Sequence, residues 1–344
     1  MVKPLEYSTD IDRAALVEIG QGGEGRVFEF ASDPSTVYKE FFFSSKNPPN
    51  ATALNGLINL RSAWTEDERS WIEERTVWPR TAVLDGGRLR GYVMKRIPEA
   101  YFRRYGVRVK PKTVICHWDF LSMREHYRYN PNLVSEVPYP TTEQVSNLIV
   151  DLAKTIEILH RHEVIVGDIS GRNLIWTDHP AWRVMLIDCD GFRVRGSGSV
   201  NHAKQTPDWE DPALGQNLTN QQSDIYKLGI AAFRAVFAAT TDHPPAHLGD
   251  APTPEGAPLR LNSLIHRSTS SASRPSVVEW VEELASGTSA MPATGPQSHP
   301  PSDTTPRSSS SRQLQTDRDT EKTIEKGSSP VKGSRPVIPM RKAE

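Results

Sequence analysis

Alternating apolar and polar residues in the N-terminal part of the chain predict a small antiparallel sheet. Five segments carry this alternation: 16–20, 26–30, 35–43, 81–84 and 91–97. A glycine cluster separates the first two segments and the turn Asp-Gly-Gly separates the last two, as expected of hairpins. We therefore expect the chain to begin as a β-rich unit.

Apolar residues at helical spacing predict two helices within this unit and a long helix after it. Leu54 and Leu57 recur at a helical interval, and the capping box 65–68 opens a second helix through Glu74. The long helix begins at Thr142. Its predicted apolar face comprises Val145, Leu148, Ile149, Leu152, Ile156 and Leu159. A β-rich start followed by helices indicates an α+β fold.

Two short β-prone segments follow the long helix. The segments 173–176 and 183–187 are separated by turn residues, so we expect them to pair as a hairpin. Such a hairpin would bring Asp188, which follows the second segment, beside Asn173, which begins the first.

Composition divides the chain near residue 285. From 286 to 344 the sequence is rich in Ser, Thr, Pro and charge, with few large apolar residues. Because such a segment cannot offset its ordering entropy by burial, we expect it to be disordered. One globular unit is expected ahead of it.

Charge and cysteine usage narrow the class of protein. Lys and Arg number 41 against 42 Asp and Glu, a net charge of −1, which argues against a nucleic-acid partner. Cys116 and Cys189 are too few for a disulfide framework, so we expect a reducing, cytoplasmic setting. The longest nearly apolar run, 228–239, contains Arg234 and is too short to cross a bilayer, so no membrane association is expected.

The glycine cluster is a candidate phosphate-binding flap. Gly20, Gly22 and Gly25 form a G-x-G-x-x-G pattern that is followed by Val27 and a predicted strand. Because a dinucleotide-binding fold needs a helix at that point, the pattern indicates a strand-turn-strand flap instead. Lys39, on the next predicted strand, could reach phosphates beneath it. A hairpin turn without a ligand and a solvated lysine are the alternatives.

Three polar residues are the candidates for chemistry. Asp168 and Asn173 lie five positions apart in a short loop, and the hairpin delivers Asp188 to them. The Asp188 carboxylate and the Asn173 amide oxygen suit Mg²⁺, which takes few protein ligands and completes its shell with waters and phosphates. Asp168 would then orient an attacking hydroxyl and accept its proton.

These motifs, in this order, resemble those of the protein kinase family, in particular its divergent bacterial members. "GQGGEGRVF" is similar to the nucleotide-covering loop, Lys39 to the third-strand lysine, "VGDISGRN" to the catalytic loop and "IDCD" to the metal-binding segment. Further along, "TPDWEDP" resembles the end of the activation segment, "SDIYKLGI" the helix whose aspartate supports the catalytic loop, and "RPSVVEW" the final arginine-bearing helix. The resemblance covers roughly residues 15 to 285.

The resemblance implies a bilobal kinase-like fold with ATP and Mg²⁺ as cofactors. It implies a β-rich N-lobe at 1–97, a mainly helical C-lobe at 98–285 and the tail at 286–344. The residues it implies for nucleotide binding are Gly20, Gly22, Gly25, Val27, Lys39 and Met94. It implies catalytic roles for Asp168, Lys39 and Asn173, and metal binding by Asn173 and Asp188.

Several positions depart from the family's pattern. Val166-Gly167 replace its His-Arg, Ser170 its catalytic-loop lysine, and Ala213 its glutamate, which leaves Arg274 without its expected partner. Because Ser170 removes a cation from the site, we expect a slower enzyme or a substitute such as Arg172. The first helix after Lys39 has no acid to pair with it. The acids of the second helix are the candidates instead, namely Glu66, Glu68, Glu73 and Glu74.

Two acids, Asp188 and Asp190, compete for the metal role. We favour Asp188 because it directly follows the apolar run ending at Ile187, where the returning strand comes nearest Asn173. The side chain of Asp190 would point the same way as that of Asp188 only if the strand continued through Cys189. It would then lie about 6 to 7 Å further along the strand. We therefore expect Asp188 to be essential and Asp190 to be largely dispensable.

The sequence thus predicts an ATP- and Mg²⁺-dependent protein kinase that phosphorylates Ser or Thr of a protein substrate. The alternatives are a pseudokinase acting as a nucleotide-gated interaction module and a small-molecule phosphotransferase. By family analogy, phosphatases or von Willebrand A proteins are expected partners.

Overall fold

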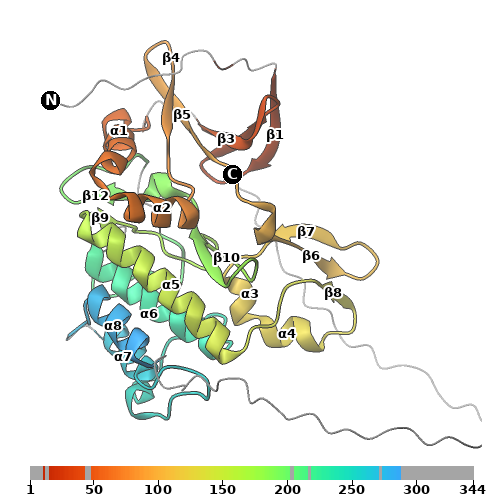
Figure 1. The fold of residues 1–344 in the computed structure, drawn as a ribbon, viewed down its shortest axis with the longest axis vertical. Coiled ribbons are helices and arrows are strands. Elements are labelled where there is room, and N and C mark those ends of the chain that lie inside the picture. The colour runs from red at the N-terminus through yellow and green to blue at the C-terminus, as the bar shows by residue number, and fades with distance from the viewer. Residues whose placement is uncertain are drawn as a thin grey trace, which may run out of the picture. The chain divides into compact units, whose positions relative to one another are not determined.

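The computed structural model describes residues 11, 15–42, 48–201, 205–215, 218–270 and 273–287. All of them belong to the first of two compact units, Met1–Pro292. The predicted tail, 286–344, lies outside the described residues except for its first two positions. Strands dominate the N-terminal part and helices the later part, which confirms the α+β prediction (Figure 1).

The N-terminal sheet has the five strands that the alternation predicts. They are β1 (Leu16–Gln21), β2 (Gly25–Phe30), β3 (Asp33–Phe41), β4 (Thr81–Asp85) and β5 (Arg88–Lys95), all antiparallel, in the order β1-β2-β3-β5-β4. Lys39 pairs with Val27 on one side and with Tyr92 on the other. Gly25 is required where β2 meets β3, because a Cβ there would lie 2.2 Å from the carbonyl oxygen of Glu40.

Two helices separate β3 from β4, as predicted. The first is α1 (Ala51–Leu60), and a 3₁₀ turn, Arg61–Ala63, connects it to α2 (Glu66–Arg75). The side chain of Thr65 accepts from the backbone N–H of Glu68 and that of Glu68 from Thr65, so the predicted capping box is present.

A second sheet, which the sequence analysis missed, follows β5. After a 3₁₀ turn, Glu99–Tyr101, strands β6 (Phe102–Val107), β7 (Lys112–Ile115) and β8 (Leu133–Ser135) pair in the order β7-β6-β8. Two short helices, α3 (Asp119–Ser122) and α4 (Arg124–Tyr129), lie between β7 and β8. The many Arg and Lys residues of this stretch obscure its alternation, although Tyr105 does pack against Phe120 and Tyr127.

Helices build the remainder of the unit. The long helix is α5 (Thr142–Arg161), and all six residues of its predicted apolar face are buried. It is followed by β9 (Val164–Ile165), β10 (Leu174–Thr177), β11 (Arg183–Leu186), a 3₁₀ turn at Cys189–Gly191, β12 (Arg193–Val194), α6 (Gln221–Val236), a 3₁₀ turn at Leu248–Asp250, α7 (Leu261–Thr269) and α8 (Val277–Gly287).

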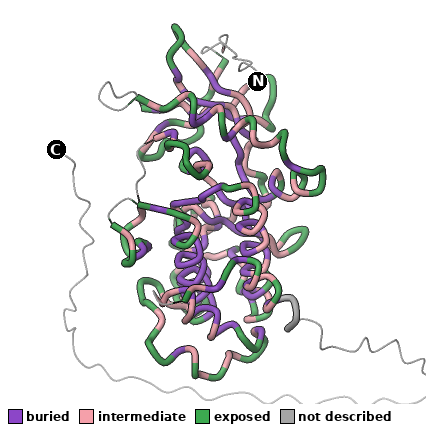
Figure 2. Tube along the Cα trace, turned by 90° about the vertical axis from the view of Figure 1, so that its left-hand side faces the viewer, coloured by how far each residue is buried: buried purple, intermediate pink, exposed green. Residues whose placement is uncertain are grey.

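The helices pack around one buried core. In Figure 1, α5 and α6 lie alongside each other, with α7 and α8 near them. Figure 2 shows buried residues running through the interior of this part, with exposed residues toward its loops. Each helix among the described residues is too short or too polar to span a lipid bilayer.

Candidate functional site

The hairpin of β10 and β11 brings Asn173 and Asp188 close together. Leu174 pairs with Leu186, and the backbone N–H of Ile187 donates to the carbonyl oxygen of Asn173 at 2.9 Å. Asp188, the next residue, is therefore placed beside Asn173, as the sequence predicted. It adopts a left-handed backbone conformation (φ 57°) that ends the strand direction at this point.

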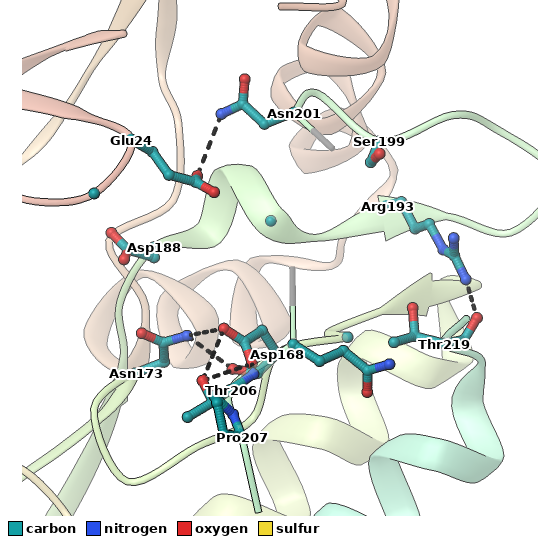
Figure 3. Close-up of a pocket in the computed structure, with 14 residues that line it drawn as sticks. Glu24, Asp168, Asn173, Asp188, Arg193, Ser199, Asn201, Thr206, Pro207 and Thr219 are labelled. Carbon is teal, nitrogen blue, oxygen red and sulfur yellow. Dashed lines mark hydrogen bonds between the residues drawn. The ribbon is translucent and has the colours of Figure 1, made fainter. Parts of the chain in front are cut away.

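Asp168, Asn173 and Asp188 all line one cavity of about 320 Å³ (Figure 3). The tip of the β1–β2 turn, Gly23 and Glu24, also contributes to its wall. The rest of the lining comes from residues that follow the hairpin: Gly191, Arg193, Ser199, Asn201, Gln205, Thr206, Pro207 and Thr219, together with Gly167. A glycine-rich turn thus shares a cavity with both acids.

Hydrogen bonds from two residues, Asn173 and Thr206, fix the carboxylate of Asp168. Nδ2 of Asn173 donates to Oδ2 of Asp168 at 2.8 Å and to its carbonyl oxygen at 2.9 Å. The backbone N–H and the hydroxyl of Thr206 donate to Oδ1 at 3.1 and 3.0 Å. Thr206, the first residue of "TPDWEDP", was not among the predicted site residues.

A residue of α6, Asp224, holds the loop that carries Asp168. Asp224, which is fully buried, accepts from the backbone N–H groups of Val166 at 2.9 Å and Gly167 at 2.8 Å, and lies 3.0 Å from Nε2 of His160. This is the support expected of the aspartate in "SDIYKLGI". Gly167 has a φ of +79°, a conformation that favours glycine.

Lys39 is paired with two aspartates. Its Nζ lies 2.7 Å from Oδ1 of Asp190 and 3.2 Å from Oδ1 of Asp188, and the Tyr92 hydroxyl donates to the same Asp190 oxygen at 2.6 Å. Burial alone lowers the pKa of Lys39, but the carboxylates of Asp190 and Asp188 outweigh it and raise that pKa above its ordinary value. Lys39 is therefore a charged, immobilised ammonium.

The acid that pairs with Lys39 corrects the sequence analysis. None of the α2 glutamates is bonded to Lys39 in the described residues. Glu68 pairs with Arg161 and His162, Glu73 with Arg61, and Glu74 with Arg75 and Arg183, while Glu66 is exposed. Their role is taken by Asp190, which is fully buried.

The two acids of "IDCD" therefore occupy different environments. Because a 3₁₀ turn follows Asp188, the strand does not continue through Cys189, and Asp190 turns toward Lys39. The Asp188 side chain is 59% exposed and lines the cavity, whereas that of Asp190 is 0% exposed. This arrangement removes the reason for expecting Asp190 to be dispensable.

The residues predicted to bind nucleotide are not among those lining the cavity, which reaches only the tip of the glycine turn. The N–H of Gly22 donates to the carbonyl oxygen of Gly25 at 2.9 Å and closes this turn. Met94 is buried in the core, at 8% exposure. The remaining predicted residues, Gly20, Val27 and Lys39, lie on β1, β2 and β3. The nucleotide-binding roles of these residues therefore stay predictions.

Of two further sequence expectations, that for Arg172 stays a prediction and that for Arg274 is wrong. Arg172, the candidate substitute cation, has a side chain that is 75% exposed, and its Nε lies 3.1 Å from Oδ2 of Asp119. Arg274 does have a partner, because its guanidinium forms a two-point ion pair with Asp211, with Nη2 2.7 Å from Oδ1. Asp211 lies two residues before Ala213, where the glutamate was expected.

The predicted magnesium ligands fit a small oxygen-ligand site. Asn173 turns Nδ2 toward Asp168, so its Oδ1 is the atom left for a cation, and the exposed Asp188 carboxylate lines the same cavity. No group of three or more His, Cys, Asp or Glu residues that could hold a metal occurs in the described residues. One carboxylate and one amide are, however, sufficient for a magnesium ion that retains its waters and substrate phosphates.

No family model matches the chain, and no curated protein matches it either.

Proposed function

We propose that the protein is an ATP- and Mg²⁺-dependent protein kinase that transfers the γ-phosphoryl group to Ser or Thr hydroxyls. The observation that carries the proposal is the shared cavity. In it, Asn173 and Thr206 orient the Asp168 carboxylate, and Asp188 lies close by beneath the tip of the glycine turn. A bilobal kinase-like arrangement, with an N-lobe at 1–97 and a C-lobe at 98–285, belongs to this proposal.

Each residue has a role that its environment supports. Asp168 accepts the proton of the substrate hydroxyl, since its oxygens are held in place by Asn173 and Thr206. Lys39, whose partner Asp188 lines the cavity, would present its positive charge to nucleotide phosphates. The bound cation would neutralise charge on those phosphates, and Asp188 and Asn173 would hold it.

The two partners of Lys39 allow Asp188 to serve the metal. Asp190 is buried and bonded to both Lys39 and Tyr92, so it holds the lysine when the exposed Asp188 carboxylate turns to a cation. The lysine therefore does not depend on the metal ligand for its position.

The segment 206–212 supports a protein substrate. Its first residue, Thr206, donates to Asp168, and Asp211 near its end is paired with Arg274. A protein hydroxyl docking beside Thr206 would meet the Asp168 carboxylate. Phosphatase or von Willebrand A partners remain an analogy to the family.

Incubation with γ-labelled ATP, Mg²⁺ and a mixture of candidate acceptors tests the proposal. We expect label in protein Ser or Thr and none with Asp168→Asn. Label in a small molecule would indicate a small-molecule phosphotransferase instead. Nucleotide binding without any transfer would indicate the nucleotide-gated module.

A further inference from the structure

Lys227 is a buried cation that the roles above do not use. It lies on α6 with 0% exposure, one turn after Asp224, so its charge needs partners within the protein. Its Nζ donates to the carbonyl oxygen of Gly167 at 2.5 Å and to Oε1 of Gln205 at 3.0 Å.

These two partners immediately precede the residues that meet at the site. Gly167 is followed by Asp168 and Gln205 by Thr206, and Thr206 is bonded to Asp168. Lys227 therefore joins, from inside the core, the two chain segments whose contact orients the Asp168 carboxylate. Since Asp224 holds the N–H of Gly167, one turn of α6 fixes both polar groups of that residue.

The charge of Lys227 also suits this position. Burial lowers the pKa of Lys227. Nearby carboxylates act in the opposite direction and favour its charged form, Asp168 most strongly. The loop itself contributes little positive charge here. Ser170 is neutral and buried, with no hydrogen-bond partner for its hydroxyl in the described part of the chain, and Arg172 is paired with Asp119.

We propose that Lys227 is a positioning residue of the site: it ties the Gly167 carbonyl to the Gln205 side chain and places a positive charge beneath Asp168 that Ser170 does not provide. This inference rests on the proposed phosphoryl transfer for its effect on rate. Its effect on the Asp168–Thr206 contact does not depend on that activity.

The test compares Lys227→Met, which removes the charge while nearly keeping the volume, with Arg124→Met. Arg124 is likewise a buried cation, but it bonds carbonyl groups at the far end of α6, including Val236 at 2.7 Å. We expect Lys227→Met to lower kcat about 100-fold with little change in KM for ATP, because it displaces the catalytic carboxylate. Arg124→Met should retain the wild-type kcat in whatever fraction remains folded.

Hydrogen exchange at the backbone amide of Thr206 supplies a second readout that needs no activity. Exchange should be faster in Lys227→Met and unchanged in Arg124→Met. If Lys227→Met does not fold, Gln205→Leu cuts one of the two links without altering α6 and should accelerate the same amide.

The outcomes separate this inference from the proposed function. A wild-type kcat in Lys227→Met, or an equal loss of kcat in both Met variants, would overturn the positioning role. If the wild-type protein transfers no phosphate, the proposed function fails. Exchange at Thr206 then decides alone: acceleration specific to Lys227→Met or Gln205→Leu supports the role, and unchanged exchange overturns it.

Discussion

The ammonium of Lys39 lies 2.7 Å from a carboxylate oxygen of Asp190, and the two side chains are only 6% and 0% exposed. A pair buried this deeply is costly to break, because removing one partner leaves the other charge uncompensated. Asp188 also reaches Lys39, at 3.2 Å, but from the exposed side of the site. Lys39 thus has one buried acidic partner, Asp190, and one exposed acidic partner, Asp188.

Replacing Asp190 with Asn should therefore destabilise the fold and weaken nucleotide binding together. We expect a loss of about 3 kcal/mol in the free energy of unfolding, since Lys39 keeps only its exposed partner. Urea unfolding measures the first effect, and the thermal shift with Mg-ATP measures the second. An Asp190→Asn protein with wild-type stability would show that Asp188 alone compensates Lys39.

Replacing Asp188 with Asn should leave stability nearly unchanged but impair Mg²⁺-dependent transfer. Because its side chain is 59% exposed, we expect a change of less than about 1 kcal/mol in stability. Phosphoryl transfer, by contrast, should require far more Mg²⁺ or cease. A titration of activity against Mg²⁺ checks this, and an unaltered Mg²⁺ dependence would remove Asp188 from the metal site.

Replacing Asp168 with Asn should abolish transfer while leaving ATP binding intact. The amide keeps the shape and can still accept from Thr206, but it cannot take a proton, so we expect a loss of about 100-fold or more. Single-turnover rates and the thermal shift with Mg-ATP should diverge in this variant. Asp178→Asn, in the turn after β10, serves as a control away from the cavity.

Local patterns were enough to predict most elements that position the site. Alternation of apolar and polar residues predicted the strands around Lys39. The turn residues between β10 and β11 predicted that Asp188 would lie beside Asn173. These features depend on neighbours in sequence, which is why they could be predicted. The structure confirms the placement of Asn173 beside Asp168 and Asp188, while their chemical roles remain predictions.

Long-range partners could not be predicted in the same way. Lys39 and Asp190 are 151 positions apart, and the choice between Asp190 and an α2 glutamate depends on a single 3₁₀ turn after Asp188. The sheet of β6, β7 and β8 was missed because its Arg and Lys residues obscure the alternation of period two. Burial, which distinguishes Asp188 from Asp190, is a property of the folded chain alone.

The ion pair between Arg274 and Asp211 should be important for stability. Their side chains are 7% and 1% exposed, so Asp211→Asn leaves a buried guanidinium poorly compensated. We expect a loss of about 3 kcal/mol in the free energy of unfolding. Glu163→Gln breaks an exposed pair, in which the side chain of Glu163 is 52% exposed and that of Arg195 65%, and should cost less than about 1 kcal/mol. Equal losses in the two variants, measured by urea unfolding, would contradict this ranking.

Glu68 should give the protein a specific sensitivity to acid. The backbone N–H of Thr65 is the main cause that lowers the pKa of this carboxyl from 4.5 to about 2, and His162 adds to the effect. Because the folded pKa lies below the unfolded one, the stabilisation is fully present above pH 4.5 and is lost as the pH falls toward about 2.

Glu68→Gln should therefore flatten the pH dependence of stability in this window. Its amide oxygen can still accept from the N–H of Thr65, so near neutral pH the variant weakens only the contacts with Arg161 and His162, at a cost of less than about 1 kcal/mol. Glu66→Gln, an exposed change in the same first turn of α2, is the matched control and should leave the slope unchanged. Urea midpoints measured across the window compare the two variants with the wild type. If Glu68→Gln keeps the wild-type slope between pH 4.5 and about 2, the contacts that Glu68 makes with Thr65 and His162 do not contribute to acid stability in the way their geometry indicates.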